Sequence, residues 1–115
     1  MTTLRGTNLR YALTRLLQLF GPSSVSEHVD GLTKWGFTVE GRPSKTVSDA
    51  LRWEMGRARV WRIGRGRYRY ADAPRSTEHR IIRRVAQLRK EALSLEAGQK
   101  SGFPDQRRST YGQNR

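Results

Sequence analysis

The sequence contains no cysteine and only two histidines among its 115 residues. Without cysteine it can form no disulfide and no thiolate zinc site, which is typical of proteins kept in a reducing compartment such as the cytoplasm. The histidines, His28 and His79, are isolated, and no pair of carboxylates stands at a spacing that suits acid–base catalysis. We therefore expect a protein that is not an enzyme and that has no cofactor and no metal site.

Long apolar runs are also missing, and acidic residues are few. No stretch approaches the roughly 18 apolar residues that cross a bilayer, and the first residues lack the apolar core of a signal peptide. We expect a cytoplasmic chain with no membrane partner. Ten Asp and Glu stand against 23 Lys and Arg, which gives a net charge of +13. Such an excess favours an anionic partner, above all nucleic acid.

Positive charge is densest in residues 59–70, which contain five arginines, three aromatic residues and no acid. Both ends of this segment are rich in strand formers, and Gly64-Arg65-Gly66 between them supplies the glycines of a tight turn. The pattern predicts an arginine-rich β-hairpin with Arg65 and Arg67 at or beside its tip. Strict alternation does not fit the apolar residues of its first strand, so either a bulge intervenes or an apolar pair is exposed. The residues expected to pack are Val60, Ile63, Tyr68 and Tyr70.

Three helices are predicted ahead of the hairpin. Apolar residues from Leu9 to Phe20 recur at helical spacing, with Thr7 or Asn8 as the cap. Ser24 followed by Glu27 is a capping-box signature for a second helix, which ends near Gly36 and is followed by a short strand over residues 37–39. The third helix should begin after Ser44 as N-cap and end near Met55 with Gly56 as C-cap.

One face of the third predicted helix is polar and carries hydroxyls near its N-terminus. Hydroxyls and a helix N-terminus suit phosphate groups, whereas Arg and Lys reach guanine edges in a major groove. Taken alone, the same face also fits an ordinary solvated surface. Together with the hairpin arginines, the candidate DNA-binding residues are Arg42, Ser44, Lys45, Thr46, Ser48, Asp49, Arg52, Arg62, Arg65, Arg67 and Arg69.

Residues from about Leu9 to Ala71 resemble a winged helix-turn-helix domain. The segments Gly41–Leu51 and Val60–Tyr68 carry the resemblance. More specifically, these segments resemble the HARE-HTH group of winged helices and, by extension, the N-terminal domain of the delta subunit of bacterial RNA polymerase. The resemblance implies a mainly α fold with a small β-hairpin. It also implies a third helix in the major groove of DNA and a hairpin that lies as a wing on the backbone or minor groove.

A last helix is predicted over residues 77–97, after a linker at residues 72–76. Its apolar residues step by four, three, four and three, as in a heptad seam, and homodimerisation through this seam is one expectation. The seam is short, so packing of the helix back on the domain is an equal alternative. The seam residues are Ile81, Val85, Leu88, Ala92 and Leu95. Residues 98–115 are polar and basic and predict a disordered tail.

The sequence therefore predicts a winged-helix domain over residues 1–71, followed by a C-terminal helix and a tail. The expected function is DNA binding by a bacterial or phage transcriptional regulator or nucleoid-associated protein. Two alternatives stay open: an RNA- or ribosome-associated protein, which the same charge would serve, and an adaptor that docks on RNA polymerase.

Overall fold

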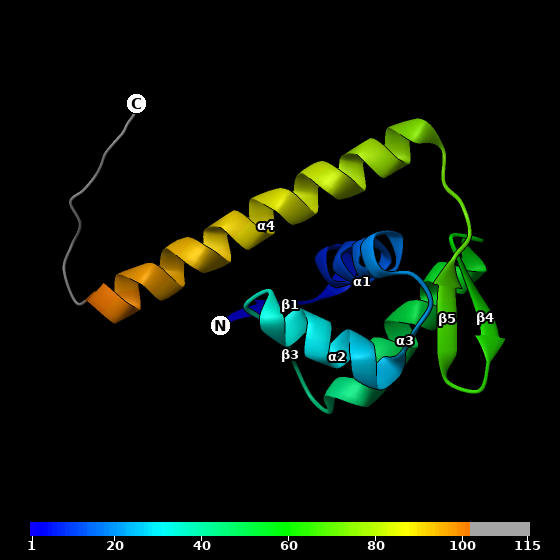
Figure 1. Cartoon of the computed structure of the whole chain (residues 1–115), viewed down its shortest axis with the longest axis horizontal. Coiled ribbons are helices and arrows are strands. Elements are labelled where there is room, and N and C mark those ends of the chain that lie inside the picture. The colour runs from blue at the N-terminus through cyan, green and yellow to red at the C-terminus, as the bar shows by residue number, and fades with distance from the viewer. Residues whose placement is uncertain (102–115) are drawn as a thin grey trace.

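The computed structural model describes the backbone of residues 1–101 and the side chains of residues 1–95, and it contains four helices and two small sheets (Figure 1). In chain order the elements are β1 (Thr2–Leu4), α1 (Gly6–Phe20), β2 (Ser23–Ser24), α2 (Val25–Lys34), β3 (Phe37–Val39), α3 (Pro43–Gly56), β4 (Val60–Gly64), β5 (Arg67–Tyr70) and α4 (Arg75–Ser101). The fold is mainly helical, as predicted. Within residues 1–101, no helix has the length and apolar character needed to cross a membrane.

The predicted capping box at the start of α2 is confirmed. The Glu27 amide donates to Ser24 Oγ at 3.1 Å, and the Ser24 amide donates to the Glu27 carboxylate at 2.7 Å. These two bonds satisfy amides that a helix start leaves without an intrahelical partner.

The predicted starts of α1 and α3 are wrong by a few residues. Arg5 is the N-cap of α1 and Arg42 is the N-cap of α3, and neither cap makes a side-chain hydrogen bond. Pro43 occupies the first turn of α3, where its fixed φ favours the helix and its missing amide costs nothing. Ser44 therefore lies inside the first turn and is not the N-cap.

The end of α3 also differs from its prediction, because Gly56 is helical and Arg57 is the C-cap. Among the residues the structure describes, Ala58 is the only non-glycine residue with a positive φ, at 60°. Its amide donates to the Met55 carbonyl at 2.9 Å, and the Arg59 amide donates to the Glu54 carbonyl at 3.1 Å. This left-handed turn reverses the chain into β4, and it places an alanine where glycine is the usual residue.

The predicted hairpin is confirmed, and it is part of a three-stranded antiparallel sheet in the order β2-β5-β4. Val60 lies opposite Tyr70 and Arg62 opposite Tyr68, but the register shifts before Gly64. The shift is a β-bulge that leaves Ile63 unpaired and 48% exposed. The expectation that Ile63 packs inside is therefore wrong, whereas Val60 and Tyr68 are buried.

A second, parallel sheet was not predicted from the sequence. β1 pairs with β3, with Thr2 opposite Phe37 and Leu4 opposite Val39. Leu4 and Phe37 are buried, so the first residues of the chain close the core beneath the connection from α2 to α3. Three residues carry too little pattern to reveal a strand, because parallel pairing depends on a partner far away in the chain.

The core is built around α1, which packs against α2, α3 and α4 (Figure 1). The buried apolar residues of its own sequence are Leu9, Ala12, Leu13, Leu16 and Leu17. Residues from every other helix join them in one cluster that includes Leu88 and Ala92 of α4. α4 therefore completes the core of the domain that precedes it.

The predicted dimer seam is occupied by the chain's own fold. Ile81, Val85, Leu88 and Ala92 are buried on the side of α4 that packs against α1, so these four side chains are not available to a second copy. Leu95, the last seam residue, is 60% exposed. The alternative, in which the helix packs back on the domain, is the observed arrangement.

The boundaries of the last helix differ from those predicted. α4 begins at Arg75, inside the expected linker, and runs to Ser101, so residues 98–101 are helical rather than part of a disordered tail. The rest of the predicted tail, residues 102–115, lies outside the described residues.

A buried carboxylate joins α1, α3 and the start of β4. The Glu54 side chain is fully buried, and both its oxygens accept hydrogen bonds from the Arg59 guanidinium, at 2.8 and 2.9 Å. The Thr14 hydroxyl of α1 donates to the same carboxylate at 3.0 Å, and Arg10 lies 3.7 Å away. The paired carboxylate raises the pKa of Arg59. A buried charge is tolerated only with such partners.

Substitution Glu54→Ala should lower the free energy of unfolding by about 3 kcal/mol, because it leaves the Arg59 guanidinium without its carboxylate inside the fold. Glu54→Gln keeps the hydrogen bond to Thr14 but loses the charge, so its free energy of unfolding should lie between those of Glu54→Ala and the unsubstituted protein. Urea denaturation measures both. The matched control is Glu40→Ala, because Glu40 pairs with Arg5 on the surface, where a loss below about 1 kcal/mol is expected. Equal losses at both sites would contradict the role assigned to Glu54.

Ala58→Gly should raise the free energy of unfolding by about 0.5–1 kcal/mol, because glycine adopts the left-handed conformation without strain. Ala50→Gly in the interior of α3 is the matched control and should lower it by about 1 kcal/mol. Thermal denaturation measures the change in stability of both variants. The two changes have opposite signs if the turn at Ala58 is strained, and the same sign if it is not.

Candidate nucleic-acid interface

The outer face of the hairpin combines exposed arginines with one exposed tryptophan. Arg67 and Arg69 of β5 are exposed, while Tyr68 between them is buried, as alternation along a strand requires. Trp61 lies opposite Arg69 on β4 and is 52% exposed. Arg65 is exposed in the turn, beside Gly66 at a φ of 67°. The structure thus places the two predicted tip residues, Arg65 and Arg67, at the end of the hairpin.

The arginines of the hairpin are positioned by neighbouring groups. The Arg69 guanidinium stacks over the Trp61 ring at 4.6 Å, which is cation–π geometry. Arg62 donates from Nε to the Gly64 carbonyl at 3.2 Å, across the bulge. Both side chains keep donors exposed to solvent, so they can still bind an anion.

The end of the hairpin is attached to the start of α2. Ser24 of β2 pairs with Arg67 of β5, and the Val25 amide donates to the Gly66 carbonyl at 3.2 Å. The Arg67 guanidinium lies 3.8 Å from the Glu27 carboxylate. Hydrogen bonds from Ser24 hold the pKa of Glu27 below its usual value, with a smaller contribution from Arg67. The tip is therefore fixed relative to the helices.

The exposed face of α3 carries cations that are arranged around one carboxylate. Asp49 lies 2.9 Å from the Lys45 ammonium and 3.5 Å from the Arg52 guanidinium. The hydrogen bond from Lys45 lowers the pKa of Asp49. Asp49 thus orients Lys45 and Arg52 rather than facing a phosphate itself. Arg42 and Ser44 are exposed at the helix start, and Ser48 is half-buried.

The Thr46 side chain makes a hydrogen bond within the fold. Its hydroxyl donates to the Glu40 carbonyl at 2.8 Å and its side chain is half-buried. The bond closes the connection between β3 and α3 and leaves the hydroxyl no proton to donate to a phosphate. Thr46 therefore has a structural role in the fold, and its contact with DNA stays a prediction.

Three residues beside this surface were not predicted. Trp53 of α3 is 49% exposed, and the guanidinium groups of Arg10 and Arg57 lie over its ring, at 4.7 and 5.4 Å from the ring centroid. The signal in the sequence was the position of Trp53, which falls outside the apolar stripe of its helix. An exposed tryptophan held by two arginines can stack on a base or add to the positive potential of this side.

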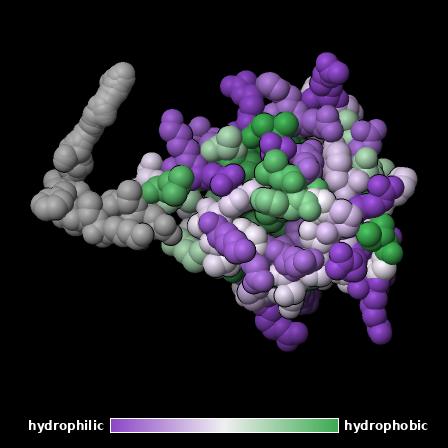
Figure 2. Space-filling model, in the orientation of Figure 1, coloured by the Kyte–Doolittle hydropathy of each residue, from purple (hydrophilic) through white to green (hydrophobic). Residues whose placement is uncertain are grey.

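The predicted residues form two adjoining groups. The hairpin group includes Arg62, Arg65, Arg67 and Arg69, and the α3 group includes Lys45 and Arg52, with α3 leading directly into β4 (Figure 1). Figure 2 shows hydrophilic side chains projecting from the hairpin end of the molecule and from α4.

Within the described residues, no three His, Cys, Asp or Glu side chains are grouped as metal ligands. Comparison with family models, curated proteins and solved structures finds no match to this chain.

His28 supports this surface from behind. Its ring is buried between α1 and α2, and Nδ1 lies 2.8 Å from the Ser24 carbonyl, to which it donates when the proton is on Nδ1. Nε2 is buried and has no hydrogen-bond partner. Burial lowers the pKa of His28 from its ordinary value of 6.5. His28 is therefore a packing residue of α2.

Because the folded protein favours neutral His28, the unfolded chain binds more protons below pH 6.5, and stability should fall as the pH is lowered from about 6.5 to 5. Well above pH 6.5 both states carry a neutral ring and the effect vanishes. His28→Asn should reduce this dependence of stability on pH, as measured by denaturation at a series of pH values between about 5 and 6.5. His79→Asn is the control, because His79 is exposed. An unchanged pH profile in His28→Asn would show that His28 is not the responsible group.

Proposed function

We propose that this chain is a winged helix-turn-helix DNA-binding protein, similar to the HARE-HTH group, that acts in transcriptional regulation or at the nucleoid. In this assignment α1, β2, α2, α3, β4 and β5 form the winged helix in its usual order. α3 is the recognition helix and the hairpin is the wing. The parallel β1–β3 pair and α4 are additions of this chain.

The observation that carries the proposal is the acid-free, exposed hairpin. Four of its five arginines are exposed: Arg62, Arg65, Arg67 and Arg69. The fifth, Arg59, is bound to Glu54 and anchors the hairpin instead. Such a concentration of guanidinium groups at a turn is unfavourable unless an anion lies against it, and the phosphates of DNA provide evenly spaced negative charge.

The α3 face supports the same assignment. Lys45 and Arg52 are held on the outward side of the helix by Asp49, in positions from which long cations reach base edges or phosphates in a major groove. The hairpin arginines then lie on the adjacent backbone or minor groove, where a narrow groove attracts arginine. Most of the affinity is electrostatic and independent of sequence.

A specific observation favours RNA as the second candidate partner. Trp61 and Trp53 are about half exposed, and each has arginine stacked on it. Unpaired bases stack on such aromatic surfaces, and they are more common in RNA loops than in duplex DNA. Competition between duplex DNA and structured RNA of equal charge separates the two candidates.

If the six cations Lys45, Arg52, Arg62, Arg65, Arg67 and Arg69 each neutralise one phosphate, log K should fall with log salt at a slope near −5. The double substitution Arg65→Ala, Arg67→Ala should weaken binding to all duplexes and reduce the slope by about 2. Fluorescence anisotropy with labelled duplex between about 50 and 200 mM salt covers the range in which the effect is large.

The matched control removes two cations outside the proposed interface, Arg5→Ala and Arg15→Ala. It lowers the net charge equally and should change the slope much less. A folded Arg65/Arg67 variant with unchanged affinity and slope would remove the hairpin from the mechanism.

A further inference from the structure

The outer face of α4 carries a row of cations that no carboxylate neutralises. Arg80, Arg83, Arg84 and Lys90 are all exposed, and within the described part of the chain none of them forms an ion pair. By contrast, the cations of the α3 face each lie within 4 Å of a carboxylate. Among residues 1–95, this row is the largest group of unneutralised cations outside the hairpin.

The acids of α4 in this region are engaged elsewhere. Glu78 accepts a hydrogen bond from the Tyr70 hydroxyl, which ties the helix start to β5, and burial raises the pKa of Tyr70 to about 12. Glu91 accepts a hydrogen bond from the Gln87 amide at 2.9 Å. Neither carboxylate pairs with the row.

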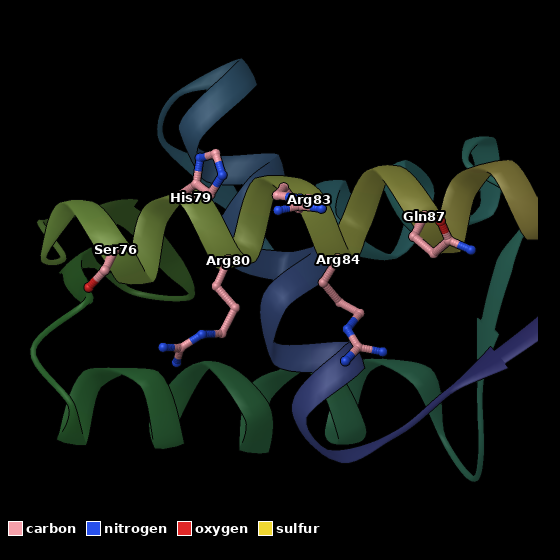
Figure 3. A pocket seen from close by; sticks show the side chains of 6 residues that line it. All are labelled: Ser76, His79, Arg80, Arg83, Arg84 and Gln87. Carbon is pink, nitrogen blue, oxygen red and sulfur yellow. The ribbon is translucent and has the colours of Figure 1, made fainter.

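Three side chains of the row, Arg80, Arg83 and Arg84, line a shallow, open hollow of about 520 Å³. Figure 3 shows Arg80 and Arg84 pointing to the same side of α4, with Arg83 and His79 directed differently. The residues that line the hollow are Ser76, His79, Arg80, Arg83, Arg84 and Gln87. All of them carry hydrogen-bond donors suited to phosphate oxygens.

The arrangement of the row is unfavourable in isolation. Arg80 is three and four residues from Arg83 and Arg84, and like charges at these spacings destabilise a helix by about 0.2–0.5 kcal/mol per pair. The helix is held instead by its opposite side, where Ile81 and Val85 are buried against α1. The result is a rigid row of cations whose repulsion a bound polyanion would relieve.

The row is not a continuation of the hairpin surface. α1 packs against both α4 and α3, and α4 starts at the top of the view in Figure 1, whereas the tip of the hairpin points to the bottom. A straight duplex that contacts the hairpin tip and α3 therefore does not reach the outer face of α4. Any anion bound there is a second one, or a segment of the first that has been bent around the protein.

We propose that the outer face of α4 is a second duplex-binding surface, so that one protomer holds two DNA segments at once. Arg80 to Lys90 span about 15 Å along a straight helix, and a duplex presents one negative charge per about 1.7 Å. Cations spread along a line fit a regularly charged polymer better than a single phosphate, which needs converging donors. The inference rests on the proposed function only in taking duplex DNA as the partner.

A bridging experiment tests this surface. A biotinylated duplex is fixed on beads, and capture of a second, fluorescent duplex by the full-length protein is measured, with anisotropy on single duplexes in parallel. The variant Arg80→Gln, Arg83→Gln, Arg84→Gln should bind single duplexes within about threefold of the unsubstituted protein but capture at least fivefold less of the second duplex. Its thermal unfolding should be unchanged or slightly raised in temperature, because the substituted side chains are exposed and the substitutions remove the repulsion of Arg80 with Arg83 and Arg84.

The control variant Arg5→Gln, Arg15→Gln, Lys34→Gln loses the same charge outside both surfaces and should bridge normally. Undiminished bridging by the α4 variant, as a dimer with two hairpins would produce, overturns the second surface while leaving the proposed function intact. A loss of single-duplex binding equal to that of Arg65→Ala, Arg67→Ala also overturns it, because the duplex would then contact both regions together. Failure of the unsubstituted protein to bind any duplex overturns both proposals.

Discussion

The carboxylate of Glu54 is the interaction on which the geometry of this protein depends. It lies where α1, α3 and the start of β4 meet, and it accepts hydrogen bonds from Thr14 and Arg59 while Arg10 lies close by. The same residue's carbonyl accepts the amide that turns the chain into β4. One residue therefore fixes the angle between α3 and the hairpin, and the relation between these two elements is what a surface for a duplex requires.

Three of the acids of this basic chain have a common role: they hold cations in place. Glu54 binds Arg59 inside the fold, Asp49 separates Lys45 from Arg52, and Glu27 caps α2 beside Arg67. The chain has a net charge of +13, and most cations among the side chains that the structure describes have no such partner. They gather at the end of the hairpin and along α4, and an anionic polymer would be attracted to both places.

Local signals made much of the fold predictable, and tertiary contacts account for the rest. The Ser24 capping box, the helical periodicity of α1 and the glycine-flanked hairpin turn are each encoded within a few residues. The bulge at Ile63, the β1–β3 pair and the contact of α4 with α1 depend on partners far away in the sequence.

The candidate site, too, was predictable only where its residues follow a local sequence pattern. The exposure of Arg65 and Arg67 follows from their place at a turn. The internal hydrogen bond of Thr46 and the contacts of Trp53 with two arginines depend on packing that no local pattern shows.

The packing of α4 also determines when the domain can be completed during synthesis. A ribosome releases the chain from its N-terminus, and domains tend to fold as units as they emerge. Here the buried side chains Ile81 to Ala92 come after every other part of the core. The side of α1 that α4 covers stays bare until then, so the nascent helices and hairpin present an apolar surface that only the last described helix closes.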